Sequence, residues 1–368
     1  MKVALIVPGG VDRSGEVRVI PALLALIRRL ASAHELHVFA THQEPAPASW
    51  SLEGARIHNI GLPRTAWRAV RCVLAEHRNA PFQIVHAIWA GSTGALAVGL
   101  GCLLRIPSLV HVAGGELVAL ADIGYGGCLS RIGRARERAV LRNATQVTCA
   151  SAAIGALVAE RGAISQRVPL GVDLARWPVR LPVRRQPAEQ ARFVHVASLN
   201  RVKDQPTLLR ALALLARRGR DFRVDVVGED TLGGEIQALA SELGLAQRIR
   251  FHGFLTQREL RPIVETADLA LITSRHEAGP VALLEAAAVG VPTVGTAVGH
   301  LAEWSPDASL AVPCRDFAAL AATLETLLDN EDLRLKIAEC AGRRAELEDA
   351  DATARAFNDT YSRLVESR

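Results

Sequence analysis

Strand-like apolar runs alternate with helix-like segments along this chain of 368 residues, and the alternation occurs twice. In the first half, the pattern predicts a strand over Lys2–Val7 and a helix over Arg18–Leu30, whose apolar residues recur at helical spacing. It restarts in the second half with a strand over Arg192–Val196 and a helix over Pro206–Arg217. Strands that alternate with helices favour βαβ units and a parallel sheet. We therefore expect an α/β protein with two domains of related architecture.

A stretch rich in proline and arginine over residues 175–191, which includes Pro187, separates the two halves and predicts a linker. We accordingly assign the first domain to residues 1–175 and the second to residues 176–350. The helical pattern of residues 351–368 follows a second domain that is already complete. This final helix is expected to cross back and pack on the first domain.

Composition narrows the class of protein. Hydrophobic residues make up 49% of the chain and charged residues 22%, which is typical of a folded globular protein. The longest strongly apolar stretch, Gly94–Leu104, has 11 residues, whereas a membrane-spanning helix needs about 20. The apolar run that follows Met1 is too short for a secretion signal. We expect a cytoplasmic protein that is at most peripheral on the inner face of the membrane.

Positive charge is concentrated in the first half. The first 180 residues hold 20 basic and 11 acidic side chains, against 23 and 27 in the remainder. One predicted helix places Arg64, Arg68, Arg71 and Arg78 beside an apolar stripe that includes Trp67. Its cationic face is either solvated or in contact with an anionic membrane surface or a phosphorylated acceptor. Nucleic acid is disfavoured as a partner because no stacking aromatic residues are interleaved with the arginines.

The most informative segment is a loop and helix in the second half. The predicted helix over Pro280–Val289 begins just after Glu277, and a helix N-terminus offers free backbone N–H groups and a positive dipole end to an anion. Gly279 lets the backbone approach a ligand closely. Glu277 and Glu285 flank the helix start, and carboxylates are good acceptors for sugar hydroxyls. The segment predicts a site for a diphosphate and a sugar, unless Glu277 caps the helix and Glu285 is only a solvated helix residue.

A second loop, Ala197–Lys203, follows the first strand of the second half. In open α/β sheets, ligands bind at the carboxyl ends of parallel strands. A lysine in such a loop can neutralise a pyrophosphate and stabilise a departing nucleoside diphosphate. Lys203 alone would be weak evidence for a site, but together with the two-glutamate segment it favours one.

These segments resemble the donor site of the family 4 retaining glycosyltransferases, which have the GT-B fold. The most specific element of the resemblance is the spacing of Glu277 and Glu285, which are separated by seven residues. The resemblance spans nearly the whole chain. The segments that carry it are Gly9–Val11, His86–Trp89, Val168–Asp173, Ala197–Lys203, Gly253 and Ser274–Gly290.

The resemblance implies two Rossmann-like, doubly wound parallel-sheet domains that face each other across a cleft. It implies that residues 1–175 bind the acceptor and that residues 176–350 bind the nucleotide-sugar donor. It further implies transfer of a hexosyl group from a nucleotide-diphosphate sugar to a glycan, lipid-linked or small-molecule acceptor. The transfer would proceed with retention of configuration and would need no metal or other cofactor.

Carried over residue by residue, the resemblance places Lys203 at the diphosphate and Glu277 at the donor sugar, as the catalytic pair, and Glu285 at the ribose. Gly10 would close on the donor from the first domain. The base would lie near Gly228 and Phe254. The implied donor-binding residues are Gly9, Gly10, Ser198, Arg201, Lys203, Gly228, Phe254, Glu277, Ala278, Gly279, Pro280, Val281 and Glu285.

Two positions depart from the pattern of the family. Ser198 stands where the family usually has an arginine, and we expect Arg201 to supply that charge from a shifted position. Ala113 stands where the family often carries a histidine. His111 or Glu116 would then take over the catalytic contact with the sugar, although a lone strand histidine such as His111 is more often a packed core residue.

The same fold admits two other functions. A non-catalytic nucleotide-sugar-binding protein is motivated by the two departures, and a nucleotide-sugar epimerase would retain the donor site while changing the reaction. A nicotinamide oxidoreductase is disfavoured because no G-x-G-x-x-G follows the first strand with an acidic residue about 20 positions further on.

Overall fold

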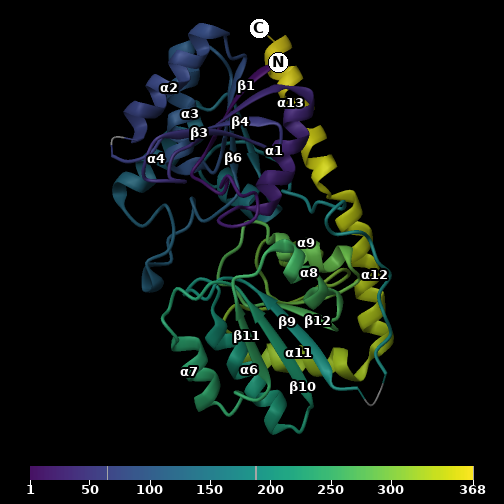
Figure 1. The fold of residues 1–368 in the computed structure, drawn as a ribbon. Coiled ribbons are helices and arrows are strands. Elements are labelled where there is room, and N and C mark those ends of the chain that lie inside the picture. The colour runs from purple at the N-terminus through teal and green to yellow at the C-terminus, as the bar shows by residue number, and fades with distance from the viewer. Residues whose placement is uncertain (64, 187–188, 368) are drawn as a thin grey trace. The chain divides into compact units, whose positions relative to one another are not determined.

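The computed structural model describes residues 1–63, 65–186 and 189–367, so Arg64 and Pro187 lie outside the described residues. The chain divides into two compact units, one of Met1–Gly171 with Ala350–Arg368 and one of Val172–Asp349 (Figure 1). Each unit contains a largely parallel sheet with helices, which confirms the predicted α/β class. Within the described part of the chain, no helix combines the length and the apolar character needed to cross a membrane.

The N-terminal unit is built on an eight-stranded sheet in the order β3-β4-β2-β1-β5-β6-β7-β8. From β4 to β7 this order is that of a Rossmann sheet, in which the chain winds outward from β1 in both directions. The β3–β4 hairpin, which is antiparallel, was not predicted, because its strands are short and only β4 is largely buried. The strands are β1 Lys2–Val7, β2 Glu35–Ala40, β3 Ala48–Leu52, β4 Ala55–Asn59, β5 Ile84–Ile88, β6 Ser108–Val112, β7 Gln146–Cys149 and β8 Gln166–Arg167.

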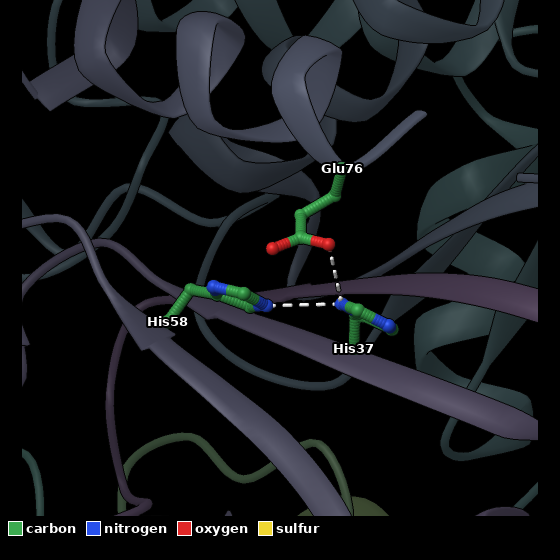
Figure 2. Close-up of side chains that lie close together, drawn as sticks. All are labelled: His37, His58 and Glu76. Atoms are coloured by element: carbon green, nitrogen blue, oxygen red, sulfur yellow. Dashed lines mark hydrogen bonds and ion pairs between the residues drawn. The ribbon is translucent and has the colours of Figure 1, made fainter. Parts of the chain in front are cut away.

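Helices connect these strands. The first begins at Pro21, three residues later than predicted, because Arg18 has a φ of 52° and because proline suits the first turn of a helix. Helix α2 lies over β2 and β4, where its Glu76 points toward His37 and His58 (Figure 2). The helices are α1 Pro21–Ala33, α2 Thr65–Asn79, α3 Ala95–Leu104, α4 Arg131–Asn143 and α5 Ala152–Ala159, with short turns η1 Ala90–Gly94 and η2 Ala121–Ile123.

The C-terminal unit repeats the arrangement with a six-stranded parallel sheet in the order β11-β10-β9-β12-β13-β14. The chain again winds outward in both directions from its first strand, so β9 and β12 are neighbours although about 70 residues separate them. The strands are β9 Ala191–Val196, β10 Phe222–Val227, β11 Ile249–Gly253, β12 Leu269–Ile272, β13 Thr293–Thr296 and β14 Leu310–Val312. The helices are α6 Gln205–Arg217, α7 Glu235–Glu242, α8 Gln257–Glu265, α9 Val281–Ala288, α10 Gly299–Trp304, α11 Phe317–Asp329 and α12 Glu331–Leu347.

Alternate residues of these strands bury their side chains in two separate cores, one on each face of the sheet. Phe193 and Leu269 pack in the first core, whereas their neighbours Val194 and Ala270 pack in the second. Side chains alternate between the faces of a strand, and helices cover both faces here. This explains why the strands read as continuous apolar runs in the sequence.

The last helix, α13 Ala350–Glu366, belongs to the N-terminal unit and lies along α1 (Figure 1). The hydroxyl of Tyr361 lies 2.6 Å from Nδ1 of His86 in β5. The ring of Phe357 packs against His86 and His111. Near its start, Thr353 accepts a hydrogen bond from the backbone N–H of Gly171 at 2.9 Å. The helix therefore covers the β5–β6 region of the N-terminal sheet with fully buried aromatic side chains.

Candidate active site

Two loops meet at the carboxyl ends of β9 and β12. Because these strands are adjacent where the winding of the sheet reverses, the loops that follow them lie side by side. The backbone N–H of Arg275 donates to the carbonyl of Val202 at 2.8 Å. The hydroxyl of Thr273 donates to the carbonyl of Lys203 at 3.0 Å. These bonds fix the lysine loop against the glutamate loop.

Lys203 and Glu277 form an ion pair in this corner. Nζ of Lys203 lies 2.5 Å from Oε1 of Glu277, and the hydroxyl of Ser274 donates to the same oxygen at 2.6 Å. The two charged side chains are 25% and 15% exposed, so both can still reach a ligand. Glu277 does not cap α9, which has no side-chain cap, and that alternative is therefore wrong.

Helix α9 starts beside this ion pair. It begins at Val281, one residue later than predicted, because Pro280 has an extended conformation with ψ of 111°. Gly290 follows the helix with a φ of 77°, as expected at the position after a C-terminal cap. The first residues of the helix line a pocket of about 160 Å³ that also contains Lys203, Ser274 and Glu277. The pocket thus combines a cation, a carboxylate and the start of a helix.

Two histidines that were not predicted lie near the pocket at the start of α9. His195 in β9 lines the pocket, and burial lowers its pKa to about 4, so it is neutral. Its Nδ1 lies 2.8 Å from the carbonyl of Leu271 and must therefore carry the proton. His300 is fully buried, and a Cβ atom on Gly279 would lie only 2.6 Å from its Nε2. A polar residue inside an apolar strand was the available signal for His195, whereas no local pattern indicated a role for His300.

Glu285 lies one turn into α9 and is only 6% exposed, so the alternative of a solvated helix residue is wrong. Burial raises the pKa of its carboxyl to about 7, and a hydrogen bond with the side chain of Gln257 limits that rise. The amide oxygen of Gln257 in turn accepts from the indole of Trp177 at 2.5 Å. Glu285 is not among the described side chains that line the 160 Å³ pocket.

Four further residues were predicted to bind the donor: Ser198, Arg201, Gly228 and Phe254. Gly228 and Ser198 lie at the ends of neighbouring strands, and a Cβ atom on Gly228, which has a φ of 151°, would lie 2.1 Å from the carbonyl oxygen of Ala197. Only glycine fits there, so the requirement is a close approach of two backbones. Phe254 is half exposed. The structure does not bring Arg201 into the pocket lining, because its guanidinium lies 3.3 Å from Glu235 on the exposed surface of α7.

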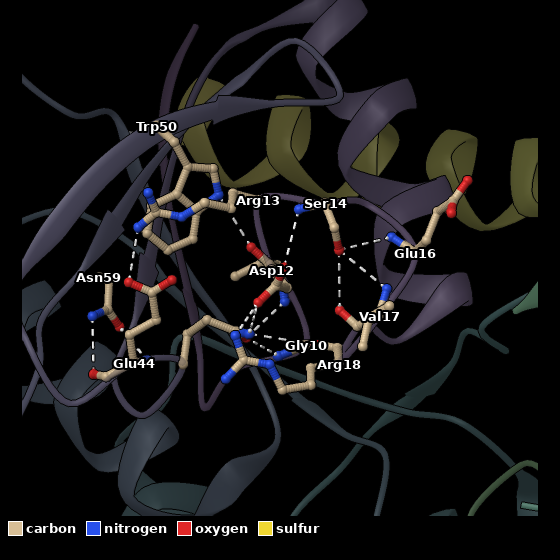
Figure 3. A network of polar contacts seen from close by, with 12 residues as sticks. Gly10, Asp12, Arg13, Ser14, Glu16, Val17, Arg18, Glu44, Trp50 and Asn59 are labelled. Carbon is tan, nitrogen blue, oxygen red and sulfur yellow. Dashed lines mark hydrogen bonds and ion pairs between the residues drawn. The ribbon is translucent and has the colours of Figure 1, made fainter. Parts of the chain in front are cut away.

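The loop after β1 lies in a network of polar contacts that includes Asp12 and Arg18 (Figure 3), and the buried side chain of Gln43 holds its backbone. The backbone N–H groups of Gly10 and Val11 donate to Oε1 of Gln43 at 2.7 and 2.9 Å. Gly10 has a φ of 83°, and a Cβ atom on Gly9 would lie 3.2 Å from the same side-chain oxygen. Asp12 pairs with Arg18 in the same network. The backbone N–H of Gly10, the residue that was expected to close on the donor, is therefore engaged within the unit.

His111 lies in the core of the N-terminal unit. It is fully buried, its Nδ1 lies 3.0 Å from the hydroxyl of Thr148, and Phe357 packs edge-on against its ring. Burial lowers the pKa of His111 to about 3. This environment is that of a packed core histidine, which was the alternative to a catalytic role.

Glu116 does face a pocket, of about 250 Å³, which Glu137, Tyr125 and Arg136 also line. Its Oε1 accepts from the backbone N–H groups of Ala90 at 2.9 Å and Ala113 at 3.4 Å. Its buried Oε2 has no hydrogen-bond partner among the described residues, and burial raises the pKa of the carboxyl. Glu137, which the sequence did not indicate, also has a buried Oε2 without a hydrogen-bond partner among the described residues and a pKa raised by burial, but its Oε1 accepts from the guanidinium of Arg136.

Comparison with known proteins gives consistent results for both units. Residues 182–344 match the family model described as glycosyl transferases group 1, and residues 19–171 match the glycosyl transferase 4-like domain. Glycogen synthase of Mycobacterium tuberculosis is 27% identical over 86% of this chain and 75% of its own. D-inositol 3-phosphate glycosyltransferase of Kineococcus radiotolerans is 28% identical over 98% of this chain and 93% of its own.

Solved structures share the fold over the whole chain. Sucrose-phosphate synthase from Thermosynechococcus elongatus superposes with a TM-score of 0.83 at 20% identity and covers 100% of both chains. HepE of Anabaena, solved in complex with UDP-glucose, gives a TM-score of 0.77 at 17% identity and covers 98% of this chain and 100% of its own. With the two family models and the Rossmann order of both sheets, these matches establish that the chain belongs to the GT-B glycosyltransferases of the family 4 type.

Proposed function

We propose that this glycosyltransferase moves a sugar from a nucleotide-diphosphate sugar to a hydroxyl acceptor, with retention of configuration and without a metal. The observation that carries the proposal is the corner formed by Lys203, Glu277, Ser274 and the start of α9. A diphosphate needs positive charge and N–H donors, and a sugar needs an acceptor for its hydroxyls. The corner offers all three within one small pocket.

In the proposed reaction, the bond between the anomeric carbon and the diphosphate oxygen breaks while the acceptor oxygen bonds to the same face of the sugar. The proton of the acceptor hydroxyl passes to the leaving diphosphate. Lys203 and the N-terminal end of α9 stabilise the charge that develops on that leaving group. Lys203 must exchange part of its contact with Glu277 for the phosphate, which frees the carboxylate to accept bonds from sugar hydroxyls.

The proposed donor is a nucleotide sugar, since HepE of Anabaena is solved with UDP-glucose. Glu285 is assigned to the ribose, and the segment around Gly228 and Phe254 to the base. Glycogen synthase and sucrose-phosphate synthase are named for the synthesis of sugar compounds, which favours a hexosyl group.

The acceptor is proposed to be a glycan, a lipid-linked sugar or a small molecule that binds the N-terminal unit. Glu116 is the predicted residue of this unit that faces a pocket, and its unpartnered Oε2 is suited to accept a bond from an acceptor hydroxyl.

Contact with an anionic membrane surface is part of the same proposal. Trp67 on α2 is 55% exposed, and the guanidinium of Arg71 lies 4.6 Å from the centre of its ring. An exposed indole beside arginines suits the interface between water and an acidic lipid surface. Arg64, which would extend this face, lies outside the described residues.

A second candidate, a protein that binds the nucleotide sugar without turnover, is favoured by one observation. Arg201 pairs with Glu235 and His111 is fully buried, so neither of these two predicted substitutes lines the 160 Å³ or the 250 Å³ pocket, whereas Glu116, the other predicted substitute for the histidine, lines the second.

Turnover by matched lysine variants separates these functions. The full chain is incubated with UDP-, GDP- and ADP-sugars and a panel of acceptors, and the product anomer is determined by NMR. Lys203→Ala is expected to lower kcat/KM by about 10²–10³-fold, because one preorganised group that stabilises developing charge is lost. Lys336→Ala removes an exposed lysine of the same unit and should change nothing. An inverted product, or equal rates in the two variants, would contradict the proposal, and donor binding without turnover would favour the second candidate.

A further inference from the structure

Two histidines and a glutamate converge in the N-terminal unit, on elements that the donor site does not use (Figure 2). His37 lies on β2, His58 on β4 and Glu76 on α2. One potential ligand atom from each lies within 4.8 Å of the other two. Nδ1 of His37 is 3.0 Å from Nε2 of His58 and 3.8 Å from Oε2 of Glu76. Both histidines are only 4% exposed.

The tautomer of His37 is fixed by a fourth residue. Its other ring nitrogen, Nε2, lies 3.1 Å from Oε1 of Glu35. An ionised carboxylate only accepts hydrogen bonds, so Nε2 carries the proton and Nδ1 presents its lone pair to the centre of the cluster. A carboxylate that orients the far nitrogen of an imidazole is the usual support of a metal-binding histidine.

A hydrogen bond between the two histidines does not account for the position of Glu76. The Nδ1 lone pair of His37 faces a carboxylate oxygen at 3.8 Å, and two electron-rich atoms repel each other at that distance. A cation between them turns this repulsion into attraction. Burial lowers the pKa of both histidines, that of His58 to about 4, so both are in the neutral form that binds metals.

We propose that His37, His58 and Glu76 bind a divalent transition-metal cation, with zinc as the best match, and that Glu35 is the positioning carboxylate. Two imidazoles and a carboxylate form a ligand set that zinc accepts, with a fourth position left for water. Two ligands held ~2.0–2.1 Å from a tetrahedral zinc lie about 3.3 Å apart, close to the 3.0 Å between the two ring nitrogens. The cation would tie β2, β4 and α2 together and would take no part in sugar transfer.

Two basic side chains compete with the cation. Nζ of Lys2 donates to the backbone carbonyls of Glu76 and Ala80 at 2.9 and 3.0 Å, so its charge is held nearby. Nη1 of Arg56 lies 3.7 Å from Oε1 of Glu76, but the Arg56 side chain is 59% exposed. The Arg56 side chain can therefore move into solvent when the Glu76 carboxylate binds a metal. Removing Arg56 should therefore strengthen binding.

The test is calorimetric titration of the EDTA-treated and desalted full chain with ZnCl₂. One zinc per chain is expected, and Co²⁺ in its place should give the intense visible absorption of a tetrahedral site. His58→Gln should abolish binding, while Glu76→Gln and Glu35→Gln should each weaken it at least tenfold. Arg56→Met should tighten it severalfold, and His42→Gln, which changes an exposed histidine of the same unit, should leave it unchanged.

His58 is buried, so its variant is accompanied by circular dichroism and a melting curve, whereas Glu76→Gln alters a partly exposed carboxyl and preserves its shape. The proposal is overturned if the wild-type chain shows no saturable binding near one equivalent. It is equally overturned if Glu76→Gln and the wild-type chain bind zinc with the same affinity.

Discussion

At the residue scale, the Lys203–Glu277 ion pair supplies both charged side chains of the pocket beside α9. The pair is only partly exposed, and the hydroxyl of Ser274 donates to the same carboxylate oxygen that contacts Lys203. When an anionic ligand replaces part of the contact between Glu277 and Lys203, the charge of the lysine stays paired, so no charge is left buried without a partner. The proposed diphosphate would therefore replace part of a contact that is already present in the pocket.

Gly279 is expected to be intolerant of any side chain. A Cβ atom there would lie 2.6 Å from Nε2 of the fully buried His300, which has little room to move. Gly279→Ala should displace the loop before α9 and weaken nucleotide binding at least tenfold, as measured by calorimetry with UDP. The double variant Gly279→Ala/His300→Ala removes the opposing ring and should recover much of the affinity. Failure of this rescue would show that His300 is not the obstacle.

Glu285 should make stability depend on pH near neutrality. Burial raises its pKa from an ordinary 4.5 to about 7 in the folded chain, so the folded state binds the proton more tightly than the unfolded state. The free energy of unfolding should therefore fall as the pH rises from about 4.5 to 7 and level off above, by at most about 3 kcal/mol. Glu285→Gln should remove this dependence and be the more stable form at pH 8. Urea denaturation at pH 5 and 8 measures the change in the free energy of unfolding, and the exposed Glu242→Gln is the control. If this change is the same in Glu285→Gln and Glu242→Gln, the role assigned to Glu285 is contradicted.

Neighbouring strands position the site at the scale of secondary structure. The lysine loop follows β9 and the glutamate loop follows β12, and the two are adjacent only because the winding of the sheet reverses between these strands. The hydrogen bonds from Arg275 to Val202 and from Thr273 to Lys203 then lock them together. Each loop is therefore placed by a strand that is buried on both faces.

Helix α13 is expected to stabilise the N-terminal unit through Tyr361. Its hydroxyl is the hydrogen-bond partner of Nδ1 of the buried His86. Tyr361→Phe keeps the ring but leaves that nitrogen unsatisfied, which should lower the free energy of unfolding by about 1–3 kcal/mol. Urea denaturation measures the change, and Arg363→Ala, which alters the exposed side of the same helix, should have little effect. Equal stability of the two variants would show that the contact contributes little.

The whole molecule consists of two Rossmann units with different charge. The N-terminal unit carries 21 basic and 13 acidic side chains, whereas the C-terminal unit carries 22 basic and 25 acidic ones. The acidic unit holds the pocket for the proposed anionic donor, so local charge, and not the net charge of the unit, must attract the ligand. Lys203 and the start of α9 supply that local charge.

Nucleotide binding should stabilise the C-terminal unit first. A ligand that binds only the folded state adds about 2.7 kcal/mol at one hundred times its Kd. Hydrogen exchange with saturating UDP should show new protection in residues 197–204 and 273–283, around the pocket. Protection confined to the N-terminal unit would contradict the placement of the donor.

Much of the fold could be predicted from the sequence because it is encoded locally. The strands β1 and β9 and the helix α6 were identified within a residue of their observed ends, since apolar periodicity and helix signals act over short distances. The β3–β4 hairpin and helix α10 were missed because short elements carry too few residues for a clear period. At the candidate site, the Lys203 and Glu277 loops were identified by their position after strands. The roles of His195, His300 and Gln43 were not, since each depends on a contact with a distant segment.

The sequence by itself determined the α/β class, the two-part organisation and the loop that precedes α9. These follow from propensity and periodicity, which are properties of neighbouring residues. Only the tertiary structure decided that Lys203 pairs with Glu277, that His111 is packed beneath α13, and that His37, His58 and Glu76 meet. Those pairings join residues far apart in the chain, and they depend on strand order and side-chain burial, which no local pattern encodes.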